Sequence, residues 1–186
     1  MARIFAVLTL LAVLAVSSTL LLGLGLRSVD IRDPMDKPAQ SMATVHRLSG
    51  IAASIAVVFV NSIVVVYFIG ASRWCKEVSD AYQLEKSYVT RSNILKRRTF
   101  PLAVGNMLVV VGIIALGGAG DPAGTFRAAA PFGLTWANLH FAAAGLGLCF
   151  ILWSAFGEAN NIRENHIVVT EVMDRVKQIR SERGLT

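Results

Sequence analysis

Residues 48–70 read LSGIAASIAVVFVNSIVVVYFIG, and this stretch decides the class of fold. It holds no charged residue, and it is long enough to cross the hydrocarbon core of a bilayer, which needs about 20 apolar residues in a helix. Comparable apolar runs lie on both sides of it along the chain. With the second run begun slightly earlier, we predict four spans, at about residues 4–26, 43–70, 101–118 and 132–157. The sequence therefore predicts an all-α integral membrane protein with a four-helix transmembrane bundle.

The composition of the whole chain agrees with this class. Of the 186 residues, 54% are hydrophobic and 16% are charged, whereas soluble domains carry about 25% charged residues. The 18 Lys and Arg outnumber the 12 Asp and Glu, and these charges lie mainly between the apolar runs. Basic residues in such places indicate a membrane surface as the partner and not a nucleic acid. The composition excludes an ordinary soluble enzyme and a disordered chain.

The first apolar run follows Arg3, as the core of a secretory signal peptide would follow its basic start. It stays apolar for about twice the usual length of such a core, so we interpret it as a retained span. Cleavage near residues 15–18 is the alternative.

Basic residues also predict the orientation of the chain. The loop of residues 71–100 holds an excess of them, namely Arg73, Lys76, Lys86, Arg91, Lys96, Arg97 and Arg98. The segment between the first two runs instead balances three basic residues with three acidic ones. Because basic loops remain on the cytoplasmic side, we predict that this loop and both termini face the cytoplasm from the inner membrane.

Two further segments have an amphipathic pattern. Residues 77–98 contain neither Pro nor Gly, which predicts a helix lying on the inner surface against anionic headgroups. After it, Pro101 suits the first turn of the third span. Residues 158–186 form a tail in which Val168 and Val172 recur at helical spacing. This predicts an amphipathic cytoplasmic helix that packs on the bundle, on the loop helix or on a partner.

Polar residues inside apolar helices are costly and therefore informative. Asn61 and Asn106 lie at the same predicted depth in the second and third spans, which predicts a hydrogen bond between these helices. His46 opens the second span, and His140 lies one or two turns into the fourth. His166 lies in the tail, where solvation is expected. The two cysteines indicate neither a disulfide nor a zinc site.

His46 and His140 carry the main functional hypothesis. Two imidazoles can supply both axial ligands of a haem iron, and Arg47 can pair with a haem propionate at the outer surface. Small residues lie one and two turns beneath each histidine, which either allow close helix packing or leave room for a flat macrocycle; they include Gly50, Ala53, Ala143, Ala144 and Gly147.

The depth of the two histidines is a difficulty for a shared iron. Measured from the centres of their apolar runs, His46 lies roughly 10 Å farther out than His140 at ~1.5 Å per residue. An earlier start of the second helix, at Pro38, or a tilt of the helices would reduce this offset. The alternative interpretation is structural: His46 pairs with headgroups at the interface, and His140 hydrogen-bonds across helices.

The motif His46-Arg47-Leu48-Ser49-Gly50 heads a long apolar helix, and a second histidine lies in the outer half of the fourth. This combination resembles one four-helix half of the heme A synthase family. The resemblance implies a haem b held between His46 and His140. Ala43 stands where the catalytic pattern of the family has Glu, the chain holds one half, and its inner loop is longer. We therefore expect no oxidation of a haem methyl group.

Two functions from different classes follow. The first is a membrane-embedded b-type haem protein, for electron transfer or for haem and oxidase assembly. The second is a non-enzymatic accessory subunit or assembly factor that docks a larger membrane complex through the loop and tail helices. A transporter is disfavoured because no acidic residue lies within a predicted span and no pair of broken helices occurs. A hydrolase is disfavoured because no nucleophile, base and oxyanion donor are placed together.

Overall fold

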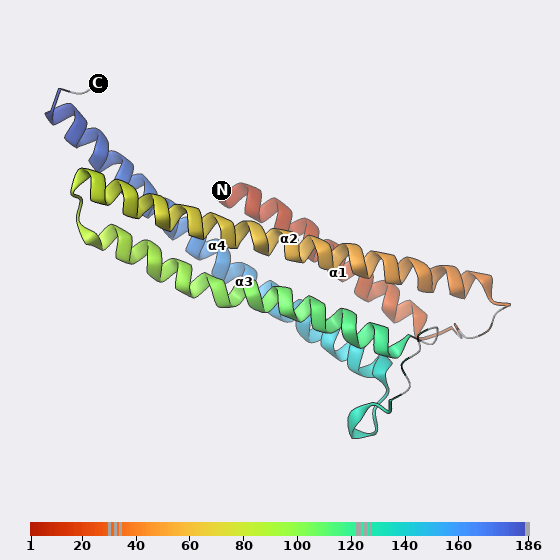
Figure 1. The fold of residues 1–186 in the computed structure, drawn as a ribbon. Coiled ribbons are helices and arrows are strands. Elements are labelled where there is room, and N and C mark those ends of the chain that lie inside the picture. The colour runs from red at the N-terminus through yellow and green to blue at the C-terminus, as the bar shows by residue number, and fades with distance from the viewer. Residues whose placement is uncertain are drawn as a thin grey trace.

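The computed structural model describes residues 1–29, 31, 33, 35–121, 124, 126 and 128–184. In this part of the chain every regular element is a helix, as predicted: α1 (Ala2–Leu26), α2 (Lys37–Tyr82), α3 (Lys86–Gly120), the short 3₁₀ turn η1 (Pro131–Gly133) and α4 (Trp136–Glu182). The four long helices form an elongated bundle (Figure 1). Each of them is long and apolar enough to cross a membrane.

The bundle has a simple up-and-down arrangement. Neighbours along the chain pack together, α1 also packs on α4, and α2 meets α4 across the centre. The chain termini point toward the end that holds the α2–α3 turn, and the α1–α2 and α3–α4 connections lie at the other end (Figure 1). We call these the inner and the outer end. Both α1 and α4 therefore have their terminal ends toward the end of the bundle that holds residues 71–100.

Local capping signals set the starts of α2 and α4. Asp36 precedes α2, and its Oδ1 accepts a hydrogen bond from the Ala39 N–H at 3.0 Å, with Pro38 in the first turn. Thr135 precedes α4, and its Oγ1 accepts one from the Asn138 N–H at 3.2 Å. Both are favoured ways to satisfy the free amides at a helix start. As a result, α2 begins before its predicted span and α4 begins after the predicted start at residue 132.

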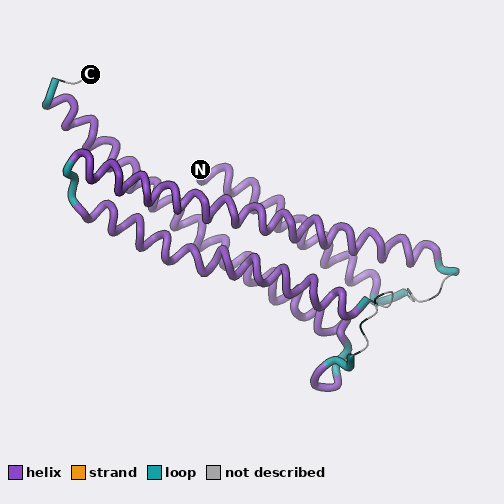
Figure 2. The backbone as a smooth tube through the Cα atoms, viewed as in Figure 1, coloured by secondary structure: helices purple, strands orange, loops and turns teal. Residues whose placement is uncertain are grey.

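The prediction of one surface-lying helix over residues 77–98 was wrong. In the structure α2 continues to Tyr82, the chain turns, and α3 runs without interruption from Lys86 through Pro101 (Figure 2). The turn includes Gln83 in the left-handed conformation, with φ 55°. The expectation that Pro101 lies in a first helical turn is corrected by the same finding.

The helices are much longer than a membrane is thick. α2 and α4 contain 46 and 47 residues. At ~1.5 Å per residue such helices measure about 70 Å, against roughly 30 Å of hydrocarbon core. The surplus lies at the inner end, where residues 71–100 and 158–182 form what we call the inner extension. Its helices can satisfy their apolar faces against one another, so none of them needs to lie on a lipid surface.

A buried polar network holds the inner extension together. The Ser72 and Ser92 hydroxyls lie 3.2 Å apart, and Ser92 also donates to the Asn165 Oδ1 at 2.9 Å. The Asn165 amide donates to the Tyr67 hydroxyl at 3.1 Å. On the surface, Arg91 forms an ion pair with Glu171. Of the three locations predicted for the tail, the structure shows packing on the helices of the former loop and, through Tyr67, on the bundle.

Apolar packing supports the same interface. Val168 and Val172 from the tail are buried, as is Cys75 on α2. Burial raises the pKa of the Cys75 thiol, and a hydrogen bond with Ser92 opposes this in part. Cys75 and Cys149 are both free thiols.

The predicted contact between Asn61 and Asn106 is confirmed. The Asn106 amide donates to the Asn61 Oδ1 at 3.1 Å, and the Ser154 hydroxyl donates to the Asn106 Oδ1 at 2.9 Å. All three side chains are buried, so side chains of α2, α3 and α4 meet through hydrogen bonds in the core of the bundle.

Candidate functional site

His46 of α2 and His140 of α4 lie together near the outer end of the bundle. Their ring centroids are 6.1 Å apart, and the ring planes are at 84° to each other. From ~1.5 Å per residue we predicted that His46 lies roughly 10 Å farther out than His140. In the structure the two rings nonetheless lie close together. The early start of α2, at Lys37, is the adjustment that the sequence allowed. The two histidines thus come from helices that face each other diagonally across the bundle.

Each imidazole is held by a backbone carbonyl of the neighbouring helix. The Nδ1 atom of His46 lies 3.1 Å from the carbonyl oxygen of Thr19 on α1. The Nδ1 atom of His140 lies 2.9 Å from the carbonyl oxygen of Ile113 on α3. A carbonyl oxygen can only accept, so Nδ1 carries the hydrogen and donates in both rings. In a neutral imidazole this leaves the lone pair on Nε2 free.

A glycine lies one turn after each of these carbonyls and against the same ring. A Cβ atom built on Gly23 would be 2.9 Å from the Cε1 atom of His46, and one on Gly117 would be 3.0 Å from the Cε1 atom of His140. Both imidazoles therefore occupy the space that a side chain would need at these positions.

The two helical hairpins present their histidines in the same way. In α1–α2 and in α3–α4 the carbonyl precedes its histidine by 27 residues. Gly23 also precedes His46 by as many residues as Gly117 precedes His140. The bundle thus places two equivalent imidazoles opposite each other.

The small residues beneath the histidines serve helix packing. A Cβ on Gly50 would lie 3.5 Å from the Thr19 side chain. Gly147 is buried, and a Cβ there would lie 2.7 Å from the Ile113 side chain. The sequence left open whether such residues allow close helix packing or leave room for a macrocycle. Gly50 and Gly147 allow close helix packing. Ala43, which stands at the Glu position of the resembling family, is buried on the outer part of α2.

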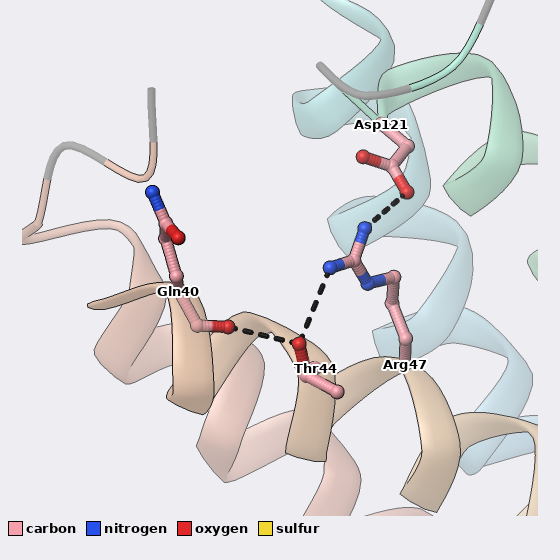
Figure 3. A network of polar contacts seen from close by, with 4 residues as sticks. All are labelled: Gln40, Thr44, Arg47 and Asp121. Carbon is pink, nitrogen blue, oxygen red and sulfur yellow. Dashed lines mark hydrogen bonds and ion pairs between the residues drawn. The ribbon is translucent and has the colours of Figure 1, made fainter. Parts of the chain in front are cut away.

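Arg47, the predicted propionate partner, lies at the outer rim. Its guanidinium forms an ion pair with the Asp121 carboxylate at 2.8 Å and contacts the Thr44 hydroxyl at 3.5 Å (Figure 3). Thr44 in turn donates to the Gln40 carbonyl at 3.0 Å. The side chain of Arg47 is 46% exposed, and an exposed pair of this kind contributes about 0–1 kcal/mol. The guanidinium can therefore exchange its partner for another anion at little cost.

A second arginine, Arg27, lies against α4 at the outer end and was missed by the sequence reasoning. It donates to the Asn138 Oδ1 at 3.1 Å, and its guanidinium carbon lies 5.1 Å from the centroid of the Phe141 ring. Asn138 and Phe141 are three residues apart and share a face of α4 that His140 does not share. The outer end thus carries two guanidinium groups, one next to His46 in the chain and one against α4.

In the described ranges, no group of three or more His, Cys, Asp or Glu side chains lies together in a way that could hold a metal ion. His166 is exposed on the tail, as expected. Comparison with models of protein families, with curated proteins and with solved structures found no match for this chain.

Proposed function

We propose that this protein is a b-type haem protein of the membrane, with His46 and His140 as the two axial ligands of one iron. The observation that carries the proposal is the 6.1 Å between the imidazole centroids. A histidine nitrogen lies about 2.0–2.1 Å from a bound transition metal such as zinc. Two imidazoles on opposite sides of one metal ion therefore have their bound nitrogens about 4 Å apart, and their ring centres are farther apart by about one ring width.

The hydrogen bonds of the pair support the same assignment. Histidines that bind a metal nearly always donate their other ring N–H to a carbonyl or a carboxylate, which fixes the tautomer and the ring orientation. His46 and His140 both do so, to Thr19 and Ile113. Structural histidines that hydrogen-bond across helices account for the Nδ1 contacts, but they do not account for the matched geometry of the two hairpins.

Two cations at the outer end suit the two propionates of a haem. Arg47 adjoins His46 in the chain, and Arg27 contacts Asn138 and Phe141 of α4. Charge-assisted hydrogen bonds from guanidinium groups to carboxylates are stronger than neutral ones. Both arginines already bind exposed or partly exposed oxygen atoms, which a propionate can replace.

The number of protein ligands favours electron transfer over catalysis. A haem held by His46 and His140 would supply one-electron oxidation and reduction. Because both histidines would bind the iron, no position would be left there for a substrate. The Nδ1–H bonds to Thr19 and Ile113 would hold both rings in place.

An absorption spectrum of the purified protein tests the proposal. Protein from haem-replete cells should show the sharp, split bands of a reduced six-coordinate b-type haem. His46→Ala and His140→Ala should each abolish or broaden these bands, and His166→Ala, which changes the exposed histidine, should leave them unchanged. A folded protein that is colourless, and that stays colourless after hemin is added, would contradict the proposal.

The inner extension favours a second function, that of an accessory subunit or assembly factor. Between α3 and α4 it carries a groove lined by Arg91, Ile94, Leu95, Arg98, Glu164, Ile167 and Val168. Ile94 and Ile167 are 43% and 53% exposed there, and exposed apolar side chains rimmed by charges are typical of interaction sites. The basic residues that follow, Lys96 to Arg98, suit anionic headgroups at the inner membrane surface.

The size of the native complex tests this second function. Ile167→Ser should release the chain from a larger complex in mildly solubilised membranes, because it removes apolar contact area within the groove. Met173→Ser is the matched control, since Met173 is 46% exposed on the same helix but does not line the groove. If both variants migrate as the unaltered protein does, the groove holds no partner.

A further inference from the structure

Glu158 is a buried acidic residue that the haem site does not use. It is the first residue after the predicted fourth span, and only 2% of its surface is exposed. Its Oε1 atom has no hydrogen-bond partner, and the described part of the chain offers the side chain no ion pair. An ionised carboxylate in such surroundings is strongly disfavoured, because burial removes its water and nothing replaces it.

Glu158 lines a small cavity at which all four helices meet. The other lining residues are Thr9 and Ala12 of α1, Val57, Val60 and Asn61 of α2, Asn106 of α3, and Ile151 and Ala155 of α4. None of them is titratable, so no helix offers a charge that would compensate an ionised Glu158. The accessible space of ≈ 10 Å³ is close to the roughly 10–15 Å³ that a single water molecule requires.

The polar atoms around this cavity fall into two groups. One N–H of each asparagine amide is already used, since Asn61 donates to the Val57 carbonyl at 2.8 Å and Asn106 donates to the Asn61 Oδ1 at 3.1 Å. The Thr9 Oγ1 is buried without a partner, like the Oε1 of Glu158. Two unpaired oxygen atoms therefore line one cavity, at least one of which can donate a hydrogen.

We propose that Glu158 is a proton-binding site in the bundle core, where the neutral acid and one water molecule connect α4 to Thr9 of α1. A protonated carboxyl group gains a donor and loses its charge, so it suits a cavity whose lining is mostly apolar. A metal cation requires a shell of several oxygen ligands, and only two unpaired oxygen atoms are present. Release of the proton would leave an uncompensated charge where the four helices meet and would loosen the bundle.

Infrared spectroscopy tests the protonation state directly. The purified protein at neutral pH should show the C=O stretch of a protonated carboxylic acid, with a shift in D₂O. Glu158→Gln should remove this band. Glu171→Gln is the matched control and should retain it, because Glu171 is partly exposed on the same helix and pairs with Arg91. A wild-type spectrum without any protonated carboxyl band overturns the proposal, and so does a band that persists in Glu158→Gln.

Thermal unfolding in detergent provides a second measurement. Gln has the shape of the neutral acid, so Glu158→Gln should unfold at the same temperature as the wild type at acidic and neutral pH. Above neutral pH the wild type should lose stability as Glu158 ionises, and the variant should not. Parallel pH profiles for the two proteins would contradict a proton at Glu158. Because neither measurement depends on haem, failure here leaves the proposed function unaffected, and the converse also holds.

Discussion

Gly23 and Gly117 are the residues that let each imidazole lie against the backbone of its neighbouring helix. Their missing side chains leave the space that the Cε1 atoms of His46 and His140 occupy. The Cβ atom of an alanine at either position would lie closer to the ring than the van der Waals distance, so the ring or the helix would have to move. The bond from Nδ1 to the carbonyl one turn earlier would then lengthen, and the Nε2 atom would turn away from its present direction.

We expect Gly23→Ala and Gly117→Ala to weaken haem binding, because each displaces one imidazole. The expected result is a broadened or reduced absorption of the reduced haem. Gly112→Ala is the matched control, since a Cβ at Gly112 meets no atom within 4 Å. That change should leave the spectrum intact and stabilise α3 by roughly 0.5–1 kcal/mol, as Ala does relative to Gly within a helix. Unaltered spectra in all three variants would show that the rings need no such room.

The hydrogen bond between Asn61 and Asn106 permits a quantitative prediction. A double-mutant cycle with Asn61→Leu and Asn106→Leu should give a coupling free energy of about 0.6 kcal/mol, the average for hydrogen bonds between membrane helices. Ser154 also donates to Asn106, so Ser154→Ala should couple to Asn106→Leu. The measurement is reversible unfolding in detergent. Strict additivity of the Asn61 and Asn106 variants would mean that the hydrogen bond contributes nothing to stability.

Sequence reasoning found the histidines and the asparagine pair but not the partners of the histidines. Hydropathy shows how deep a residue lies, and Asn61 and Asn106 could be matched on depth alone. The partners of His46 and His140 are a backbone carbonyl and a glycine, and neither differs by type from other positions in an apolar run. Their only signal is the equal spacing from each histidine, which a search for short repeats does not detect.

At the scale of elements, the turn between α2 and α3 is the feature that could not be predicted from the sequence. Residues 77–98 lack Gly and Pro, and Gln83 takes a left-handed conformation that usually requires Gly. The preference of Gln83 for negative φ therefore opposes the observed turn. The packing of the two arms against each other and against α4, through Ser92, Asn165 and Val172, outweighs that preference.

This conflict predicts that Gln83→Gly will stabilise the inner extension. Gly adopts positive φ without the steric cost of a Cβ, so the unfolding temperature in detergent should rise, with a gain of roughly 0.5–1 kcal/mol at the turn. Gln178→Gly is the control, because Gln178 lies within α4, where Gly should lower the stability by a similar amount. A drop for Gln83→Gly would show that the turn does not keep this conformation.

At the scale of the molecule, the surplus length of α2 and α4 lies at one end only. The outer connections follow closely on the histidine site, whereas the inner extension continues past the predicted spans. An asymmetric bundle of this kind places the proposed haem near the outer surface and the proposed docking groove beyond the inner one. The proton-binding site at Glu158 lies between the two, where α1 still packs on α4.

This arrangement depends on the orientation of the chain, which labelling of single cysteines can determine. In a background without Cys75 and Cys149, we expect Arg97→Cys to be shielded from a membrane-impermeant maleimide on intact cells and Asp33→Cys to react. Both positions are exposed in the structure, so their difference reports the membrane and not burial. The physical reason is the excess of Lys and Arg in residues 71–100, which resist transfer across the membrane. Both variants should react after the cells are permeabilised, which serves as the control for reactivity. Labelling of Arg97→Cys but not Asp33→Cys on intact cells would invert the topology and place the inner extension outside.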